Sequence, residues 1–195
     1  MRAVAHELAR YEDLVALPPE IRAEIVEGAI EVLPSASFEH GEIATDLAGE
    51  VRSVFGRGRG GPGGWWITVE FDVRLEPHGV VRPDIVGWRR ARLPVKPSQP
   101  PAEVVPDWIC EVLSPGDGKH DRRTKKALHA RFGVAHDWIV DPELRLLEAY
   151  TLEPSGLWLN TGTYDETSKA RIAPFDAIEL DLANVLPPVE PPAAS

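Results

Sequence analysis

The chain has 195 residues, of which 43% are hydrophobic and 27% charged, a balance typical of one soluble globular domain with a sizeable core. Its formal charge of −10 excludes a protein that binds nucleic acid through overall basicity, although local basic patches remain compatible with it. The sequence lacks an apolar run near the roughly 18 to 20 residues of a membrane span, and the single Cys110 excludes a disulfide framework, so we expect a cytoplasmic protein with no membrane segment.

The first 55 residues predict a short helix, a β-hairpin and a long amphipathic helix. The hairpin turns at Glu27-Gly28, a pair typical of a tight two-residue turn. The long helix carries apolar residues at helical spacing, and His40 shares the buried side of its first turn. These elements span residues 11–17, 22–33 and 38–55.

The glycine-rich stretch 56–64 predicts a flexible loop. It resembles a phosphate-binding loop, but it follows a helix instead of a strand and lacks the Lys-Ser/Thr ending. A nucleotide cradle is therefore disfavoured. Arg57 and Arg59 remain candidates for contact with a nucleic-acid backbone.

Two strands are expected next, at 65–75 and 80–88, joined by a turn at 76–79. Strict alternation in the first strand places Glu70 and Asp72 on its solvent face. The Pro- and Arg-rich stretch 89–105 predicts an irregular surface excursion.

The stretch 106–141 predicts a strand, a tight turn, a helix and a second strand. Glu111 interrupts an otherwise apolar strand, where a charge costs several kcal/mol unless it is paired or holds a metal. That carboxylate is the strongest functional signal in the chain. Strands at 145–152 and 157–163, an edge strand with a short helix in 178–186, and a disordered Pro-rich tail at 188–195 complete one domain spanning 1–187.

Asp84 and Glu111 have the residue types and spacing of a divalent-cation site. Alternation places each carboxylate on one face of its strand, and neighbouring strands would bring both to one point. Hard cations such as Mg²⁺ prefer such oxygens. Asp121 and Lys125 lie four residues apart on one helix face. A lysine there can stabilise charge on a phosphate, giving a set suited to phosphodiester hydrolysis.

The ordered motifs resemble the Uma-two family, which belongs to the PD-(D/E)XK nuclease superfamily. The likeness extends from about Tyr11 to Leu186 and includes a histidine, His40, that opens the first long helix. The motifs are AEIVEGAIEV from Ala23, PDI at 83–85, EVLSP at 111–115, Asp121 with Lys125, and WIVDP at 138–142.

The resemblance implies an α/β (α+β) fold with a restriction-endonuclease-like core, in which helices flank a mixed central β-sheet. It also implies Asp84 and Glu111 as catalytic ligands of Mg²⁺ (or Mn²⁺). Leu113 occupies the position of the superfamily's strand lysine, so Lys125 on the next helix is the replacement, with Asp121 supporting it. His129 stands where the family usually has tyrosine.

Simpler structural roles remain open for several of these residues. Asp84 fits a strand end that receives backbone hydrogen bonds, and Lys126, one position round the helix from Lys125, is expected to face solvent. Glu24 is either a further catalytic acid or a polar residue of an exposed hairpin. His40 is either a catalytic residue or a packing residue.

The sequence therefore predicts a Mg²⁺-dependent endonuclease that hydrolyses nucleic-acid phosphodiester bonds, with DNA as the favoured substrate. Two sites in a homodimer would suit cleavage of both strands of a duplex. The alternative is a catalytically inactive nucleic-acid-binding or regulatory module on the same fold, which Leu113 and the acidic total favour. Hydrolysis of another phosphoester is a third option.

Overall fold

The computed structural model describes residues 8–114 and 118–186, and for 118–123 the backbone alone. The tail expected at 188–195 lies outside the described residues. The helical segments are α1 (Tyr11–Val15), α2 (Phe38–Val51), the π-helical turn η1 (Arg52–Gly56), α3 (Gly118–Arg131) and the 3-10 turn η2 (Leu182–Asn184). The strands are β1 (Ala23–Val26), β2 (Ala29–Val32), β3 (Trp65–Val69), β4 (Val73–Glu76), β5 (Gly79–Val81), β6 (Ile85–Arg89), β7 (Trp108–Val112), β8 (His136–Asp141), β9 (Leu146–Leu152), β10 (Trp158–Asp165), β11 (Lys169–Ala170) and β12 (Leu180–Asp181).

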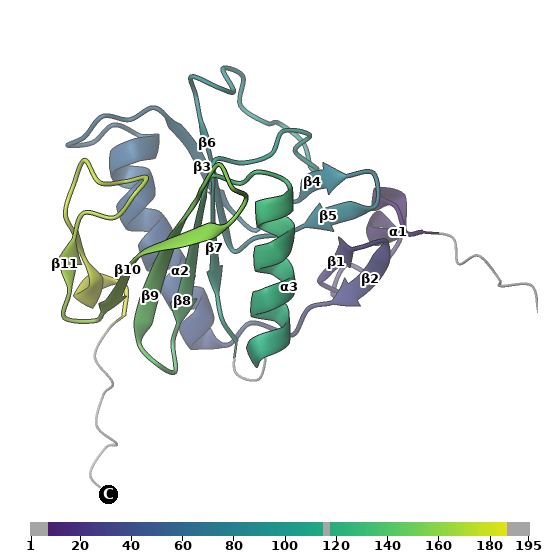
Figure 1. Cartoon of the computed structure of the whole chain (residues 1–195). Coiled ribbons are helices and arrows are strands. Elements are labelled where there is room, and N and C mark those ends of the chain that lie inside the picture. Colours follow the sequence, from purple (N-terminus) through teal and green to yellow (C-terminus); the bar gives the residue numbers. More distant parts are fainter. Residues whose placement is uncertain (1–7, 115–117, 187–195) are drawn as a thin grey trace, which may run out of the picture.

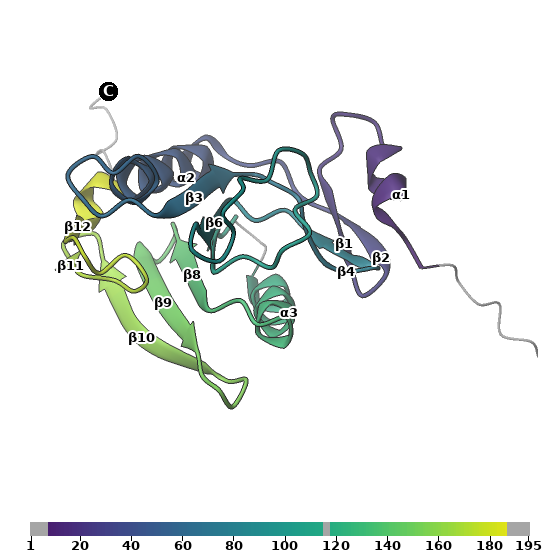
Figure 2. The same ribbon diagram turned by 90° about the horizontal axis from the view of Figure 1, so that it is seen from above.

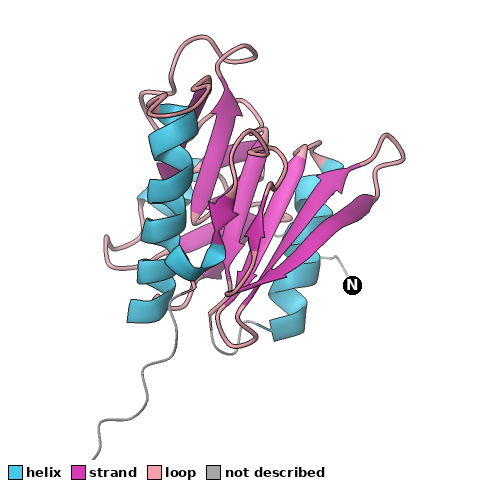
Figure 3. Ribbon diagram, turned by 90° about the vertical axis from the view of Figure 1, so that its left-hand side faces the viewer, coloured by secondary structure: helices cyan, strands magenta, loops and turns pink. Residues whose placement is uncertain are grey.

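Six strands form a mixed central sheet in the order β10-β9-β8-β7-β6-β3 (Figure 1). Neighbouring strands are antiparallel except β7 and β8, which run parallel and are joined through α3. A parallel pair needs such a crossover connection. Helices α2 and α3 cover opposite faces of the sheet (Figures 2 and 3), so the predicted mixed sheet flanked by helices is confirmed.

The core has two layers, one on each face of this sheet. On the α2 face, Phe175 packs among four aromatic rings with centroid separations of 4.7 to 5.6 Å. On the α3 face, Leu128 joins a buried cluster with Val86 of β6 and Ile109 of β7. These two layers fix the positions of the strands and helices that carry the site.

The long helix begins with a side-chain cap. The Ser37 hydroxyl accepts a hydrogen bond from the His40 backbone N–H at 3.1 Å, which satisfies one of the free donors of the first turn. The predicted helix 38–55 is observed as α2 followed by η1. None of the helices in the described ranges is long and apolar enough to cross a membrane.

A smaller sheet, in the order β2-β1-β5-β4, lies beside the central one. The predicted hairpin forms its β1-β2 pair, and the turn residues Glu27 and Gly28 both have positive φ, at 50° and 81°, as a type I′ turn requires. Strand β1 is buried along its whole length, whereas β2 is exposed. Pairing of β1 with β5 brings the first hairpin against the segment that precedes β6.

The prediction of single strands at 65–75 and 80–88 is wrong. The chain leaves the central sheet after β3 at Glu70, which has a φ of 46°, and enters the small sheet as β4. It returns from β5 to β6 through Pro83, which has no N–H for a ladder hydrogen bond. Asp72 lies in the first crossing and is buried, not solvated, because Arg82 and Tyr11 bind its carboxylate.

Candidate active site

Asp84 stands immediately before β6, where the chain enters the central sheet. Its Oδ2 accepts a hydrogen bond from the Val112 backbone N–H at 2.8 Å, and its Oδ1 lies 3.0 Å from Nε2 of His40. The side chain is buried and lines a pocket at this end of the sheet. Asp84 therefore does receive a backbone hydrogen bond at a strand end, and it also faces the pocket.

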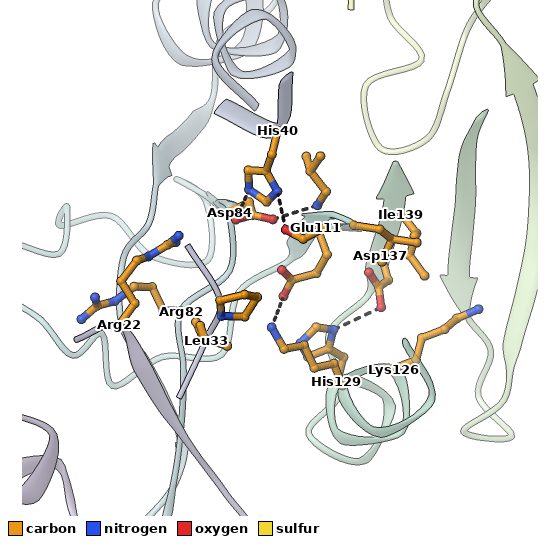
Figure 4. A pocket seen from close by; sticks show the side chains of 15 residues that line it. Arg22, Leu33, His40, Arg82, Asp84, Glu111, Lys126, His129, Asp137 and Ile139 are labelled. Carbon is orange, nitrogen blue, oxygen red and sulfur yellow. Dashed lines mark hydrogen bonds and ion pairs between the residues drawn. The ribbon is translucent and has the colours of Figure 1, made fainter. Parts of the chain in front are cut away.

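Glu111 reaches the same pocket from the neighbouring strand (Figure 4). Ile85 pairs with Cys110 in the antiparallel β6-β7 ladder, so Asp84 stands across from Glu111 in register. The alternate residues Val86 and Ile109 share the core cluster on the α3 face. Both carboxylates therefore lie on one face of the sheet, as strand alternation predicts.

Lys125 extends from α3 toward two carboxylates. Its Nζ lies 3.2 Å from Oε2 of Glu24 and 3.8 Å from Oε1 of Glu111. The other Glu24 oxygen accepts a hydrogen bond from the Arg82 backbone N–H at 2.7 Å. Glu24 is thus a buried member of the site and not a polar residue of an exposed hairpin. Asp121 lies on α3, but its side chain is outside what the structure describes.

Burial raises the pKa of the Glu111 carboxyl well above its usual range. The nearby Lys125 charge opposes this effect, whereas the carboxylates of Asp84 and Glu24 add to it by repulsion. Only 12% of the Glu111 side chain is exposed, and its Oε1 is buried without a hydrogen-bond donor, facing Lys125 at the distance given above. The site therefore favours an added cation or proton at Glu111.

His40 is a buried contact of Asp84. Its Nε2 meets the carboxylate, while Nδ1 lies 3.3 Å from the Ser114 hydroxyl, so both ring nitrogens have partners. The Ser37 cap holds the backbone of this turn. His40 consequently helps to fix the orientation of the Asp84 carboxylate.

A buried His129–Asp137 pair, in which Asp137 was not predicted from the sequence, lines the other side of the pocket. Nδ1 of His129 lies 3.1 Å from Oδ2 of Asp137, and both residues are about 1% exposed. The sequence signal for Asp137 was the same as for Glu111: a carboxylate inside an otherwise apolar strand.

Lys126 does not face solvent as expected. It is half-buried, and its Nζ lies over the ring of Tyr150 on β9, 2.9 Å from the centroid. The Trp158 indole N–H also donates to the Lys126 backbone carbonyl at 2.9 Å. The Lys126 ammonium therefore points away from Glu111 (Figure 4), although the residue also lines the pocket.

The pocket is small, with a volume of about 50 Å³, enough for a few waters but not for a nucleotide. Asp84 and Glu111 suit a hard cation, because both present carboxylate oxygens and Glu111 Oε1 lacks a donor. Within the described part of the chain, no three His, Cys, Asp or Glu side chains form a ready metal cage. Mg²⁺ tolerates this, since it keeps several waters when one or two carboxylates bind it.

The six-stranded mixed sheet with helices on both faces is the α/β architecture that the resemblance implied. The sequence pattern of the Uma2 family, described as "Putative restriction endonuclease", matches residues 8–183, and the chain belongs to this family. It is the Uma-two family that the motifs indicated.

A solved structure has a similar fold. The crystal structure of a "putative nuclease belonging to DUF820" from Anabaena variabilis ATCC 29413 aligns with a TM-score of 0.70 and 22% sequence identity. The alignment covers 91% of this chain and 97% of that one. No curated protein matches the chain.

Proposed function

We propose that the protein is a Mg²⁺-dependent endonuclease that hydrolyses phosphodiester bonds in nucleic acid, with DNA as its main substrate. Membership of a family described as "Putative restriction endonuclease" supports nuclease chemistry. One observation carries the proposal: Asp84 and Glu111 line one pocket from neighbouring strands, with Lys125 Nζ 3.8 Å from Oε1 of Glu111.

Each residue has a distinct role in this proposal. Asp84 and Glu111 hold the cation, and His40 with the Val112 N–H keeps Asp84 in position. A bound Mg²⁺ supplies charge neutralisation at the scissile phosphate and a more acidic water. Lys125 places a positive charge beside the phosphoryl oxygens, and Glu24 holds Lys125 there.

The raised pKa of Glu111 makes cation binding sensitive to pH. A ligand carboxyl must lose its proton before it binds a metal ion, so the cation competes with that proton. The pocket admits only water-sized groups, and the polynucleotide must therefore lie across its mouth and present a phosphate to it.

Plasmid cleavage in Mg²⁺ tests the proposal. Asp84→Ala and Glu111→Ala should remove cleavage, and Lys125→Met should lower kcat by about 100-fold or more, the usual effect of losing one stabilising donor. Lys126→Met is the matched control, because Lys126 contacts Tyr150 instead of Glu111. Metal-dependent cleavage that persists in both alanine variants would contradict the proposal, provided that circular dichroism shows all variants folded.

An inactive nucleic-acid-binding module is the second candidate, because Leu113 takes the place of the usual strand lysine. Calorimetry with Mg²⁺ separates the two. Binding heat that disappears in Glu111→Ala supports the enzyme, whereas no binding at millimolar Mg²⁺ supports the module. Parallel assays on RNA, and sedimentation of the intact protein, test the preference for DNA and the proposed homodimer.

A further inference from the structure

We propose that a second surface, along the free edge of β3, binds a single-stranded segment of nucleic acid. This proposal deepens the nuclease proposal, because the strand held there would be part of the substrate. The surface, here called the edge groove, consists of two adjoining hollows of about 280 and 330 Å³ that share Arg52, Arg57, Ile67 and Thr68. Neither hollow includes a residue of the candidate active site.

The edge groove carries positive charge without compensation. Arg52, Arg57, Arg90 and Lys96 line it, and among the described residues that line either hollow there is no Asp or Glu. Arg52, Arg57 and Lys96 are exposed, and none of them forms an ion pair within the described part of the chain. In a chain with a formal charge of −10, such a surface favours an anionic ligand.

Aromatic rings accompany these charges. Trp66 and Phe71 are half-buried in the same hollow, and the Trp66 indole N–H donates to the Leu93 carbonyl at 2.9 Å, which fixes the ring. The Arg90 guanidinium lies 3.9 Å from the Trp66 ring centroid and donates to the carbonyls of Trp65 and Gly56. These neutral carbonyl acceptors position the guanidinium but do not neutralise its charge. Stacking rings beside fixed cations are the elements that bind single strands.

The edge groove leads toward the candidate active site. Strand β3 is the edge strand of the central sheet, and it pairs with β6 so that Val69 stands opposite Ile85, the neighbour of Asp84. Both Val69 and Trp65 line the groove, so it follows β3 for roughly 14 Å. Helix α2 runs beside this strand, with His40 near its start and Arg52 just beyond its end (Figure 2).

The shape favours an unpaired strand over a duplex. Bases in a duplex have their faces stacked against one another, so only a single-stranded or flipped base can stack on Phe71 or on the Arg90 guanidinium, which itself covers the Trp66 ring. A hollow of about 280 Å³ suits one base-sized group. The arginines at its rim would then contact the phosphates on either side.

Fluorescence anisotropy with a labelled single-stranded DNA of about 12 nucleotides, a length within the usual site sizes, tests this proposal in EDTA. The chelator prevents cleavage and removes any dependence on the carboxylate site, so the result stands whether or not the protein proves to be a nuclease. The variants are Arg52→Gln/Arg57→Gln and the control Arg10→Gln. Arg10 is exposed, lies in a different part of the chain and lines neither hollow.

The double variant should bind more weakly, and its plot of log K against log[salt] should be shallower by about 1.4, or about 0.7 for each lost phosphate contact. Arg10→Gln should bind like the wild type. An abasic oligonucleotide of equal length should bind the wild type at least about fivefold more weakly, because it lacks bases to stack. Equal losses in the double variant and the control, equal binding of the abasic strand, or equally strong competition by polyglutamate would each overturn the proposal.

Discussion

Replacing Glu111 by Gln should make the metal-free protein more stable at neutral pH. The same change should remove the stabilisation that bound Mg²⁺ gives. Gln has nearly the same shape as Glu but cannot ionise, so the variant removes a charge that the fold buries. Only 12% of the Glu111 side chain is exposed, and the carboxylates of Asp84 and Glu24 repel it. Lys125 still has Glu24 at 3.2 Å after the change.

The size and pH dependence of the effect follow from this burial. An incompletely compensated buried polar group costs about 1 to 3 kcal/mol in proteins, and we expect Glu111→Gln to be more stable by that amount at pH 8. Folding raises the pKa of Glu111, so a proton on this carboxyl stabilises the folded state. This contribution to the free energy of unfolding is complete below the unfolded-state pKa of about 4.3 and is lost as pH rises through the folded-state pKa. The gap between variant and wild type should therefore be small at pH 4 and grow with pH.

Urea unfolding in EDTA between pH 4 and 8 measures this gap, with Glu20→Gln at an exposed position as the control. Adding Mg²⁺ at about 1,000 times its Kd should reverse the order, because the site then gains about 4.1 kcal/mol and only the wild type keeps both ligands. A variant that is less stable than the wild type at pH 8, or a gap that does not change with pH, would refute the assignment of Glu111 as a buried, destabilising charge.

Two further predictions concern the core and the crossing between the sheets. Phe175→Ala should lower the free energy of unfolding in urea by about 3 to 5 kcal/mol, because it empties the centre of the aromatic cluster. The control Phe38→Ala, at an 87% exposed position, should change it by less than about 0.5 kcal/mol. Equal effects of the two substitutions would contradict the packing. Burial and the hydrogen bond to Asp72 raise the pKa of Tyr11 to about 12, so the stability that its proton contributes should persist to pH 10 and disappear as pH rises through 12. Absorbance titration at the tyrosinate band should show one late step that Tyr11→Phe removes, and an unchanged titration in that variant would contradict the contact.

The sequence allowed the main features of the fold and site to be predicted because they rest on local patterns. The Glu27-Gly28 turn, the helical spacing after Ser37 and the alternation in β7 each constrain the backbone directly. Motif order supplied the rest, including Lys125, whose Nζ lies 3.8 Å from Oε1 of Glu111. Alternation also predicted that Asp84 and Glu111 share a face, given neighbouring strands.

The errors arose where distant segments decide the outcome. Alternation continues through Glu70, so it could not show that the chain passes from one sheet to another, with Asp72 turned inward to Arg82. The two alternatives for Glu24 stayed open for the same reason, because its partners, the Arg82 backbone N–H and Lys125, are far from it in the sequence. The contact of Lys126 with the Tyr150 ring likewise joins residues on separate elements, so the helical pattern alone could not predict it.

Anomalous diffraction from a crystal soaked in Mn²⁺ tests the central claim most directly. We expect one manganese peak at about 2 Å from a carboxylate oxygen of both Asp84 and Glu111, the distance typical of a small hard divalent cation. The same soak of Glu111→Gln should show no peak. A wild-type crystal without manganese at these carboxylates, or with the ion bound elsewhere, would contradict the proposed metal site.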